Sequence, residues 1–209
     1  GIDMSRLPEW PLQLKGDVKG NMQHLALNVQ QLLWPTMLEA NARGTISNLT
    51  DPDHMEAEVD LYAKSYDMQP LLATFDVPTK DIRIPHGLSI DGNVQVDGQR
   101  YMTSLTAYEG KGTAKLSAFF DARQMAYDAQ ADVQNVDLKH FLPNYPLSTL
   151  NSQLSISGKG TDFMQRSTWM DSDVNIAHLG YDKYNMDDIK MQAHLTNGHA
   201  LIDLMTCNA

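Results

Sequence analysis

Hydrophobic and polar residues alternate along most of this chain with a period of two. The clearest stretch is "LSIDGNVQVDGQ" (88–99), in which every second residue is apolar or small and every residue between is polar. Successive side chains of a β-strand point to opposite faces, so this pattern is typical of a strand with one apolar and one polar face. The same pattern occurs in "PLQLKGDVKGNMQ" (11–23) and in "LNSQLSISGKGT" (150–161).

Glycines recur at equivalent places in these three stretches. Each stretch carries two of them late on its less polar face, and the first of each pair is Gly16, Gly92 or Gly158. Their spacing of about 70 residues indicates a divergent structural repeat. Gly inside a strand marks a bend, a bulge or a close approach of two backbones. Repeated bending at one depth predicts a sheet that curves.

Further alternating segments and two exceptions complete the predicted unit. Strand patterns also occur in "LALNV", "EANARGTI", "AEVDLYA", "TAKLSAFF", "YDAQADV" and "IKMQAHL". Two segments, 66–75 and 136–142, break the alternation. Asp67 and Asp137 lie near their starts, where they would act as helix N-caps, so we expect a short helix in each segment. We therefore expect one continuous domain of three units at 8–80, 85–146 and 147–209, the third of them partial.

The apolar faces of such strands must be covered. Each Leu or Val left in water forgoes on the order of 2 kcal/mol. A second sheet, closure into a barrel, or a curled trough would each supply a cover. Much of the inward face is Ala, Gly, Val and Met, which favours a trough, whereas Leu-rich stretches such as Leu12, Leu14, Leu25 and Leu27 would fill a core. The pattern predicts an all-β fold and leaves these arrangements open.

Composition and charge narrow the function classes. The chain has 209 residues, is 42% hydrophobic and 20% charged, and carries a formal net charge of −10. The composition is that of a globular protein, and the negative charge makes nucleic acid a poor partner. No apolar run is long enough for a membrane-spanning helix, and the first residues lack the features of a signal peptide. We expect an excised piece of a longer protein.

The strand repeats resemble a known family. "LPEWPLQLKGDVKGNMQHLALNVQQL" and "IPHGLSIDGNVQVDGQRY", followed by "VDLKHFLP", are similar to the AsmA-like and TamB group of Gram-negative envelope proteins. The likeness covers nearly the whole chain and is closest to an interior or C-terminal portion of a TamB-like protein of the Bacteroidetes branch. It implies a β-taco, which is a long curved sheet with an apolar groove.

The resemblance also implies a function. Members of this group are anchored in the inner membrane, extend through the periplasm, and act in phospholipid transport and outer-membrane biogenesis with a partner barrel. The anchor would lie in a part of the protein not included here. Apolar residues facing the groove would contact phospholipid acyl chains. These candidates are Leu14, Val18, Leu27, Val59, Ile90, Val94, Val133, Leu154 and Ile156.

Two other functions remain open from the sequence. Exposed strand edges would suit a scaffold or chaperone that binds outer-membrane protein strands by β-augmentation. A carbohydrate-binding β-sandwich is the other alternative, and "YDKYNMDD" (181–188) resembles the polar and aromatic surface of a sugar binder.

No catalytic motif stands out in the sequence. We interpret "DPDHMEAE" (51–58) as a solvated turn, because its spacing matches no familiar metal loop. The two copies of "GKGT" (110–113 and 158–161) lack the P-loop pattern. Cys207 has no evident His partner, and no Ser is framed as in hydrolases. We expect a protein that is not an enzyme and that uses neither metal nor cofactor.

Overall fold

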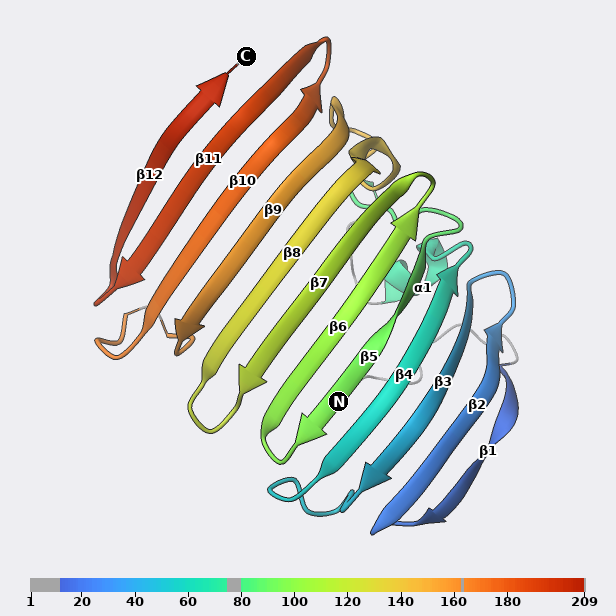
Figure 1. Ribbon diagram of the computed structural model, residues 1–209. Coiled ribbons are helices and arrows are strands. Elements are labelled where there is room, and N and C mark those ends of the chain that lie inside the picture. Colours follow the sequence, from blue (N-terminus) through green and yellow to red (C-terminus); the bar gives the residue numbers. More distant parts are fainter. Residues whose placement is uncertain (1–11, 75–79, 163, 209) are drawn as a thin grey trace.

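Twelve antiparallel strands form one open, uncurled sheet in which neighbours in sequence are neighbours in space (Figure 1). The computed structural model describes residues 12–74, 80–162 and 164–208. The strands are β1 (Gln13–Asn21), β2 (His24–Trp34), β3 (Leu38–Ser47), β4 (Glu56–Ser65), β5 (Ser89–Asp97), β6 (Arg100–Glu109), β7 (Gly112–Asp121), β8 (Ala126–Asp137), β9 (Leu147–Lys159), β10 (Trp169–Tyr181), β11 (Tyr184–Thr196) and β12 (His199–Asn208). The prediction of an all-β, antiparallel fold is confirmed.

The two predicted short helices are present. They are α1 (Gln69–Thr74) and the one-turn 3₁₀ helix η2 (Leu138–His140). Asp137 caps η2, since its side chain accepts a hydrogen bond from the backbone N–H of Lys139. Asp67 Oδ1 accepts a 3.1 Å bond from the N–H of Gln69 just before α1. Short Asp side chains make this contact readily, which is why they mark helix starts in a sequence.

The predicted units each contain four strands. The range 8–80 holds β1 to β4 and α1, the range 85–146 holds β5 to β8 and η2, and the range 147–209 holds β9 to β12. The repeat relationship among the units stays a prediction. The alternation pattern predicted no strand at β6 or β10. The sequence of β6 does not alternate cleanly. Apolar Met102 lies in the polar row of Gln95, and polar Thr103 lies in the apolar row of Val94.

The described residues form neither a sandwich nor a closed barrel, because there is one sheet with β1 and β12 at its ends. This sheet is open and uncurled, so the predicted curl into a taco-like groove is not seen, because each strand pairs only with its neighbours in the chain. Gly16 lies at a β-bulge in β1, as its place in the strand predicted. At Gly92 the backbone of the neighbouring strand β6 approaches closely. A Cβ built there would lie 2.8 Å from Leu105 Cα and closer still to Ser104 O.

The buried apolar residues lie near one end of the sheet. Among the described residues these are Met37, Met68 and Val136. Backbone hydrogen bonds tie the connections at that end together, from Tyr66 N to Met37 O at 2.7 Å and from Arg83 N to Phe141 O at 2.8 Å. Helix α1 lies behind the sheet in the view of Figure 1. This small core fixes the strand ends and leaves the broad faces of the sheet to other contacts.

Candidate functional site: the two faces of the sheet

One face of the sheet is predominantly apolar, with Thr103 and Ser172 as polar interruptions in the row described below. Residues paired across strands share a face, so the register defines a row that crosses the whole sheet. The row through Val94 reads Val18, Leu27, Gly44, Val59, Val94, Thr103, Ala118, Ala129, Ile156, Ser172, Ala193 and Ile202. We call the side of the sheet that carries this row the apolar face.

The structure brings all nine candidate lipid-contact residues onto the apolar face. Five lie in the row just given, namely Val18, Leu27, Val59, Val94 and Ile156. Leu154 lies in the neighbouring row, opposite Ala131 and Val174. The next row holds the last three, Leu14, Ile90 and Val133. The period-two pattern therefore placed these residues correctly relative to one another, although they come from six different strands.

None of these nine side chains is buried. Leu14 is 64% exposed, Val18 is 56% exposed and Leu154 is 39% exposed, and the other six are half-buried. Residues on one face of a sheet shield one another partly, but a second layer is needed to remove them from water. These exposed fractions show that no packed layer covers the apolar face in the described part of the chain.

The total surface supports a single-layer description. The accessible surface is 13322 Å² for a chain of 23.4 kDa. A compact monomer of this mass exposes about 9,700 Å². An open sheet exposes more because each strand has two faces and only its two neighbours for cover. Large apolar side chains such as Leu14, Val18 and Ile202 are part of this exposed surface.

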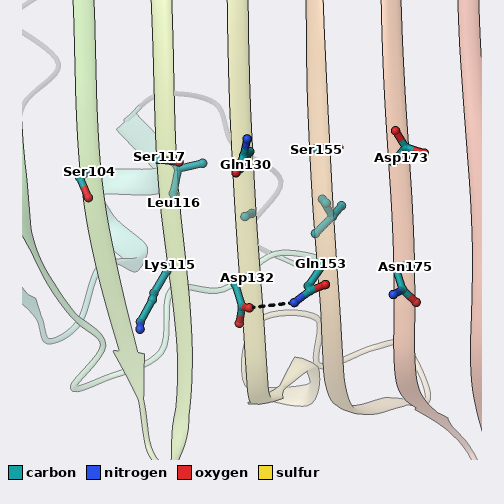
Figure 2. Close-up of a pocket in the computed structure, with 12 residues that line it drawn as sticks. Ser104, Lys115, Leu116, Ser117, Gln130, Asp132, Gln153, Ser155, Asp173 and Asn175 are labelled. Carbon is teal, nitrogen blue, oxygen red and sulfur yellow. Dashed lines mark hydrogen bonds between the residues drawn. The ribbon is translucent and has the colours of Figure 1, made fainter.

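The opposite side of the sheet, which we call the polar face, is polar in an unbroken row. The row through Ser104 reads Asp17, Asn28, Arg43, Asp60, Asn93, Ser104, Ser117, Gln130, Ser155, Asp173, Gln192 and Asp203. A hollow of about 520 Å³ lies over β6 to β10, lined largely by these side chains and by Lys115, Asp132, Gln153 and Asn175 (Figure 2). Nothing in the alternation of polar and apolar residues predicts this hollow.

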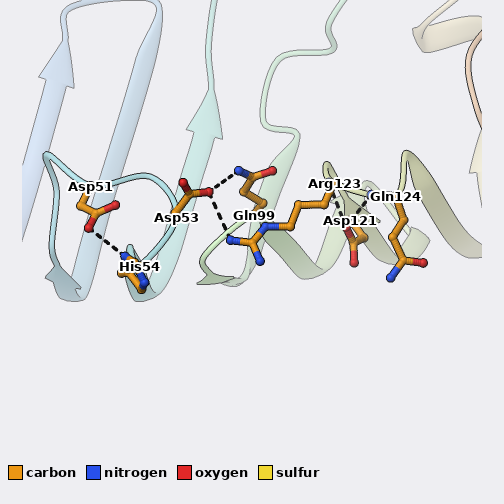
Figure 3. A network of polar contacts seen from close by, with 7 residues as sticks. All are labelled: Asp51, Asp53, His54, Gln99, Asp121, Arg123 and Gln124. Atoms are coloured by element: carbon orange, nitrogen blue, oxygen red, sulfur yellow. Dashed lines mark hydrogen bonds and ion pairs between the residues drawn. The ribbon is translucent and has the colours of Figure 1, made fainter.

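Polar contacts link the hairpin turns at the other end of the sheet (Figure 3). Asp53 Oδ1 accepts a 3.2 Å hydrogen bond from Arg123 Nη2 and another from the Gln99 side chain. These hydrogen bonds and the ion pair with Arg123 lower the pKa of Asp53. These contacts join three turns that are distant in sequence. Asp53 is 46 positions from Gln99 and 70 positions from Arg123, so no local sequence pattern predicts the network.

Asp121 organises the turn between β7 and β8. Its Oδ1 accepts hydrogen bonds from the backbone N–H groups of Gln124 at 3.0 Å and Arg123 at 2.9 Å, and Oδ2 lies 3.5 Å from Arg100 Nε. The Gln124 N–H makes the largest contribution to lowering the pKa of Asp121, with Arg123 N–H and Arg100 adding to it against the opposing effect of burial.

Stability at acid pH is expected to reflect Asp121. A carboxyl group whose pKa is lower in the folded state stabilises the fold above its unfolded pKa and loses that contribution as the pH falls through the folded value. We expect Asp121→Asn to lower the melting temperature most near pH 7, and the difference from the wild-type chain to shrink below about pH 4. Thermal melts over pH 3–7 measure this. A difference that grows at acid pH would contradict the assignment.

The sequence motifs considered as candidate sites lie in turns and along paired strands. "DPDHMEAE" begins in the turn between β3 and β4, where His54 Nδ1 lies 2.8 Å from Asp51 Oδ2. No group of three metal-ligating side chains converges among the described residues. The first "GKGT" copy spans the turn at Gly110 and Lys111 between β6 and β7 and the first two residues of β7. His178 pairs with Asp187 at 2.7 Å and His194 pairs with Asp171 across β10 and β11, and no sequence pattern predicted these contacts.

The fold and the two faces define the class of this protein as a single-layer antiparallel β-meander with one apolar and one polar face. No family model, curated protein or solved structure matches the chain. In the described part of the chain, no helix has both the length and the apolar character that a membrane crossing requires.

Proposed function

We propose that this chain is a periplasmic segment of a TamB-like protein and carries phospholipid acyl chains along its apolar face between the inner and outer membranes. In this proposal the open sheet curls around its lipid cargo so that the apolar face lines a taco-like groove, and the nine candidate residues contact the lipid tails. The observation that carries the proposal is the row through Val94, which crosses all twelve strands, is apolar or small except at Thr103 and Ser172, and has no second sheet over it in the described part of the chain.

The physics of lipid transfer suits such a surface. Each CH₂ of an acyl chain gains about 0.8 kcal/mol when it leaves water, so an unassisted crossing of the periplasm is strongly opposed. An apolar face offers contacts that are non-directional and similar from strand to strand. A chain held by such contacts is able to slide, whereas a deep pocket with specific polar contacts would retain it. The head group stays outside, in water.

The proposal is tested by mass spectrometry of lipids extracted from the full chain after purification from a Gram-negative host. We expect bound phospholipid in the extract, and we expect the protein to speed transfer of a fluorescent phospholipid between neutral vesicles. Purified protein that carries no lipid and leaves the transfer rate unchanged would contradict the proposal. Crosslinking to outer-membrane barrel precursors without a lipid signal would favour the scaffold alternative.

The hollow on the polar face favours a second candidate, which is binding of an oligosaccharide. Ser104, Ser117 and Gln130 line it and make no side-chain hydrogen bond to any described residue, while Asp132 Oδ2 accepts a 3.2 Å bond from Gln153 Nε2 (Figure 2). Hydroxyl, amide and carboxylate groups are the partners that sugar hydroxyls use. This candidate needs no sandwich, because the site lies on one sheet. Binding on a glycan array that is lost in Gln130→Ala would support it.

A further inference from the structure

An apolar pair of side chains interrupts the polar face beside the hollow. Met102 of β6 and Phe119 of β7 are direct cross-strand partners, and each lies two residues from a serine that lines the hollow, Ser104 or Ser117. Side chains two residues apart on a strand point to the same face, so Met102 and Phe119 belong to the polar face. Met102 is 36% exposed and Phe119 is half-buried.

The neighbours of this pair in its row are polar. The row reads Gln95, Met102, Phe119 and Asp128 from β5 to β8. A single exposed apolar side chain is ordinary on a protein surface, whereas an apolar pair next to a hollow with hydrogen-bonding groups is typical of a ligand site. We call Met102 and Phe119 the platform. The platform offers an apolar surface, and the hollow beside it offers polar contacts.

The platform and the hollow together match the two sides of a pyranose ring. Ser104, Ser117 and Gln130 line the hollow and make no side-chain hydrogen bond to any described residue (Figure 2). A gluco-configured ring carries its hydroxyl groups at the rim, and its two faces carry only C–H groups. These C–H groups pack on the electron-rich face of an aromatic ring, while rim hydroxyls bond to hydroxyl and amide side chains. Residues two apart on a strand are about 7 Å apart, so one ring is able to touch both.

The shape of the hollow suits a chain of such rings. It extends from Ser104 on β6 to Asn175 on β10, and five neighbouring strands span about 19 Å. Its volume is about 520 Å³. A β-1,4 linkage between gluco-configured rings is equatorial at both ends, so the chain stays extended and is able to follow the hollow across the strands.

Negative charge around the hollow determines which sugars fit. Asp132 and Asp173 line it, Asp128 lies next to the platform, and the one cation among the described lining residues is Lys115. The 3.2 Å hydrogen bond that Asp132 accepts from Gln153 comes from a neutral amide and leaves the charge of the carboxylate in place. A uronic acid or a phosphorylated sugar would bring like charges together here, and a neutral sugar would not.

We propose that the polar face binds a neutral, β-linked gluco-oligosaccharide, with one pyranose ring stacked on Phe119 and its hydroxyl groups bonded to the side chains that line the hollow. The proposal rests on the oligosaccharide candidate given above, and it adds the sugar class and a binding residue that lies outside the hollow itself. It is independent of lipid binding, because the platform lies on the face opposite to the apolar face.

Isothermal titration calorimetry of the full chain with cellohexaose tests the proposal. The β-1,4-linked hexamer of glucuronic acid has the same ring geometry and adds carboxylates, so it is the charged comparison. We expect the wild-type chain to bind cellohexaose more tightly than the charged hexamer. Phe119→Ala is expected to weaken cellohexaose binding about tenfold, since loss of an aromatic contact has this magnitude. Phe119→Trp keeps an aromatic face and is expected to retain binding.

Phe120→Ala is the matched control, because it makes the same change one position further along β7. Phe120 is also half-buried but lies on the apolar face, where its ring stacks with that of Tyr101 at a centroid distance of 6.3 Å. We expect this variant to bind cellohexaose as the wild type does. Circular dichroism checks that both alanine variants remain folded.

The possible results separate the stacking contact from the candidate function. Equal loss of binding in both alanine variants, or full binding by Phe119→Ala, would overturn the contact with Phe119. Tighter binding of the charged hexamer would overturn the preference for neutral sugars. A wild-type chain that binds neither hexamer would overturn the whole proposal, whereas the oligosaccharide candidate itself fails only if binding on the glycan array is absent or is unaffected by Gln130→Ala.

Discussion

Replacement of Val94 and Ile156 by Asp in one chain is expected to lower the amount of co-purified phospholipid by at least about tenfold. Both residues lie in the row that crosses the apolar face. A carboxylate placed against acyl chains loses its water or becomes neutral, and either change costs several kcal/mol. Since about 1.4 kcal/mol corresponds to a tenfold change in affinity, two such sites suffice for this effect. Mass spectrometry of extracted lipid, normalised to protein, provides the measurement.

The matched control carries the same two charges on the polar face. Ser104 and Ser117 lie in central strands and pair with each other, and their other partners in the row are Asn93 and Gln130. Ser104→Asp with Ser117→Asp therefore adds charge where water already solvates polar groups. We expect unchanged lipid recovery in this control. Equal lipid loss in both variants, or none in the Val94 and Ile156 variant, would argue against acyl-chain contact on the apolar face.

Gly92→Ala is expected to destabilise the fold by about 2 to 3 kcal/mol, because overpacking against a fixed neighbour has this magnitude. The added methyl group would overlap the backbone of β6 at Ser104 and Leu105, which is itself held by pairing with β7. For a chain of this size the corresponding fall in melting temperature is roughly 5 to 10 °C. Thermal unfolding followed by circular dichroism measures it.

Ala118→Val serves as the comparison for this glycine. Ala118 is half-buried on the apolar face and lies in the row of Val94, over which the described residues place no packed layer. Added bulk there is expected to change the melting temperature by no more than about 2 °C, which corresponds to an effect within about 0.5 kcal/mol. A tolerant Gly92 would disprove the close backbone approach. A strongly destabilising Ala118→Val would indicate a layer packed over this face.

Some features were accessible to sequence analysis because they depend on local geometry. The side chains of a strand alternate whatever surrounds it, so the polar or apolar class of each face followed from the period of two. The Asp137 cap was predictable because the bond reaches only to Lys139. Strict alternation failed at the bulge in β2, where Val29 and Leu32 lie in adjacent rows of one face despite their odd spacing. A bulge changes the phase, and the composition of β2 gave no sign of it.

The sequence by itself determined the all-β class, the antiparallel strands, the short helices and the set of residues that share the apolar face. Only the tertiary structure decided that the strands form one open sheet in chain order, that a hollow lies on the polar face, and that Asp53 joins turns distant in sequence. The physical reason is range. Alternation and capping act over a few residues, whereas the number of layers, the register at bulges and the pairing of edges depend on contacts between segments whose separation no local pattern encodes.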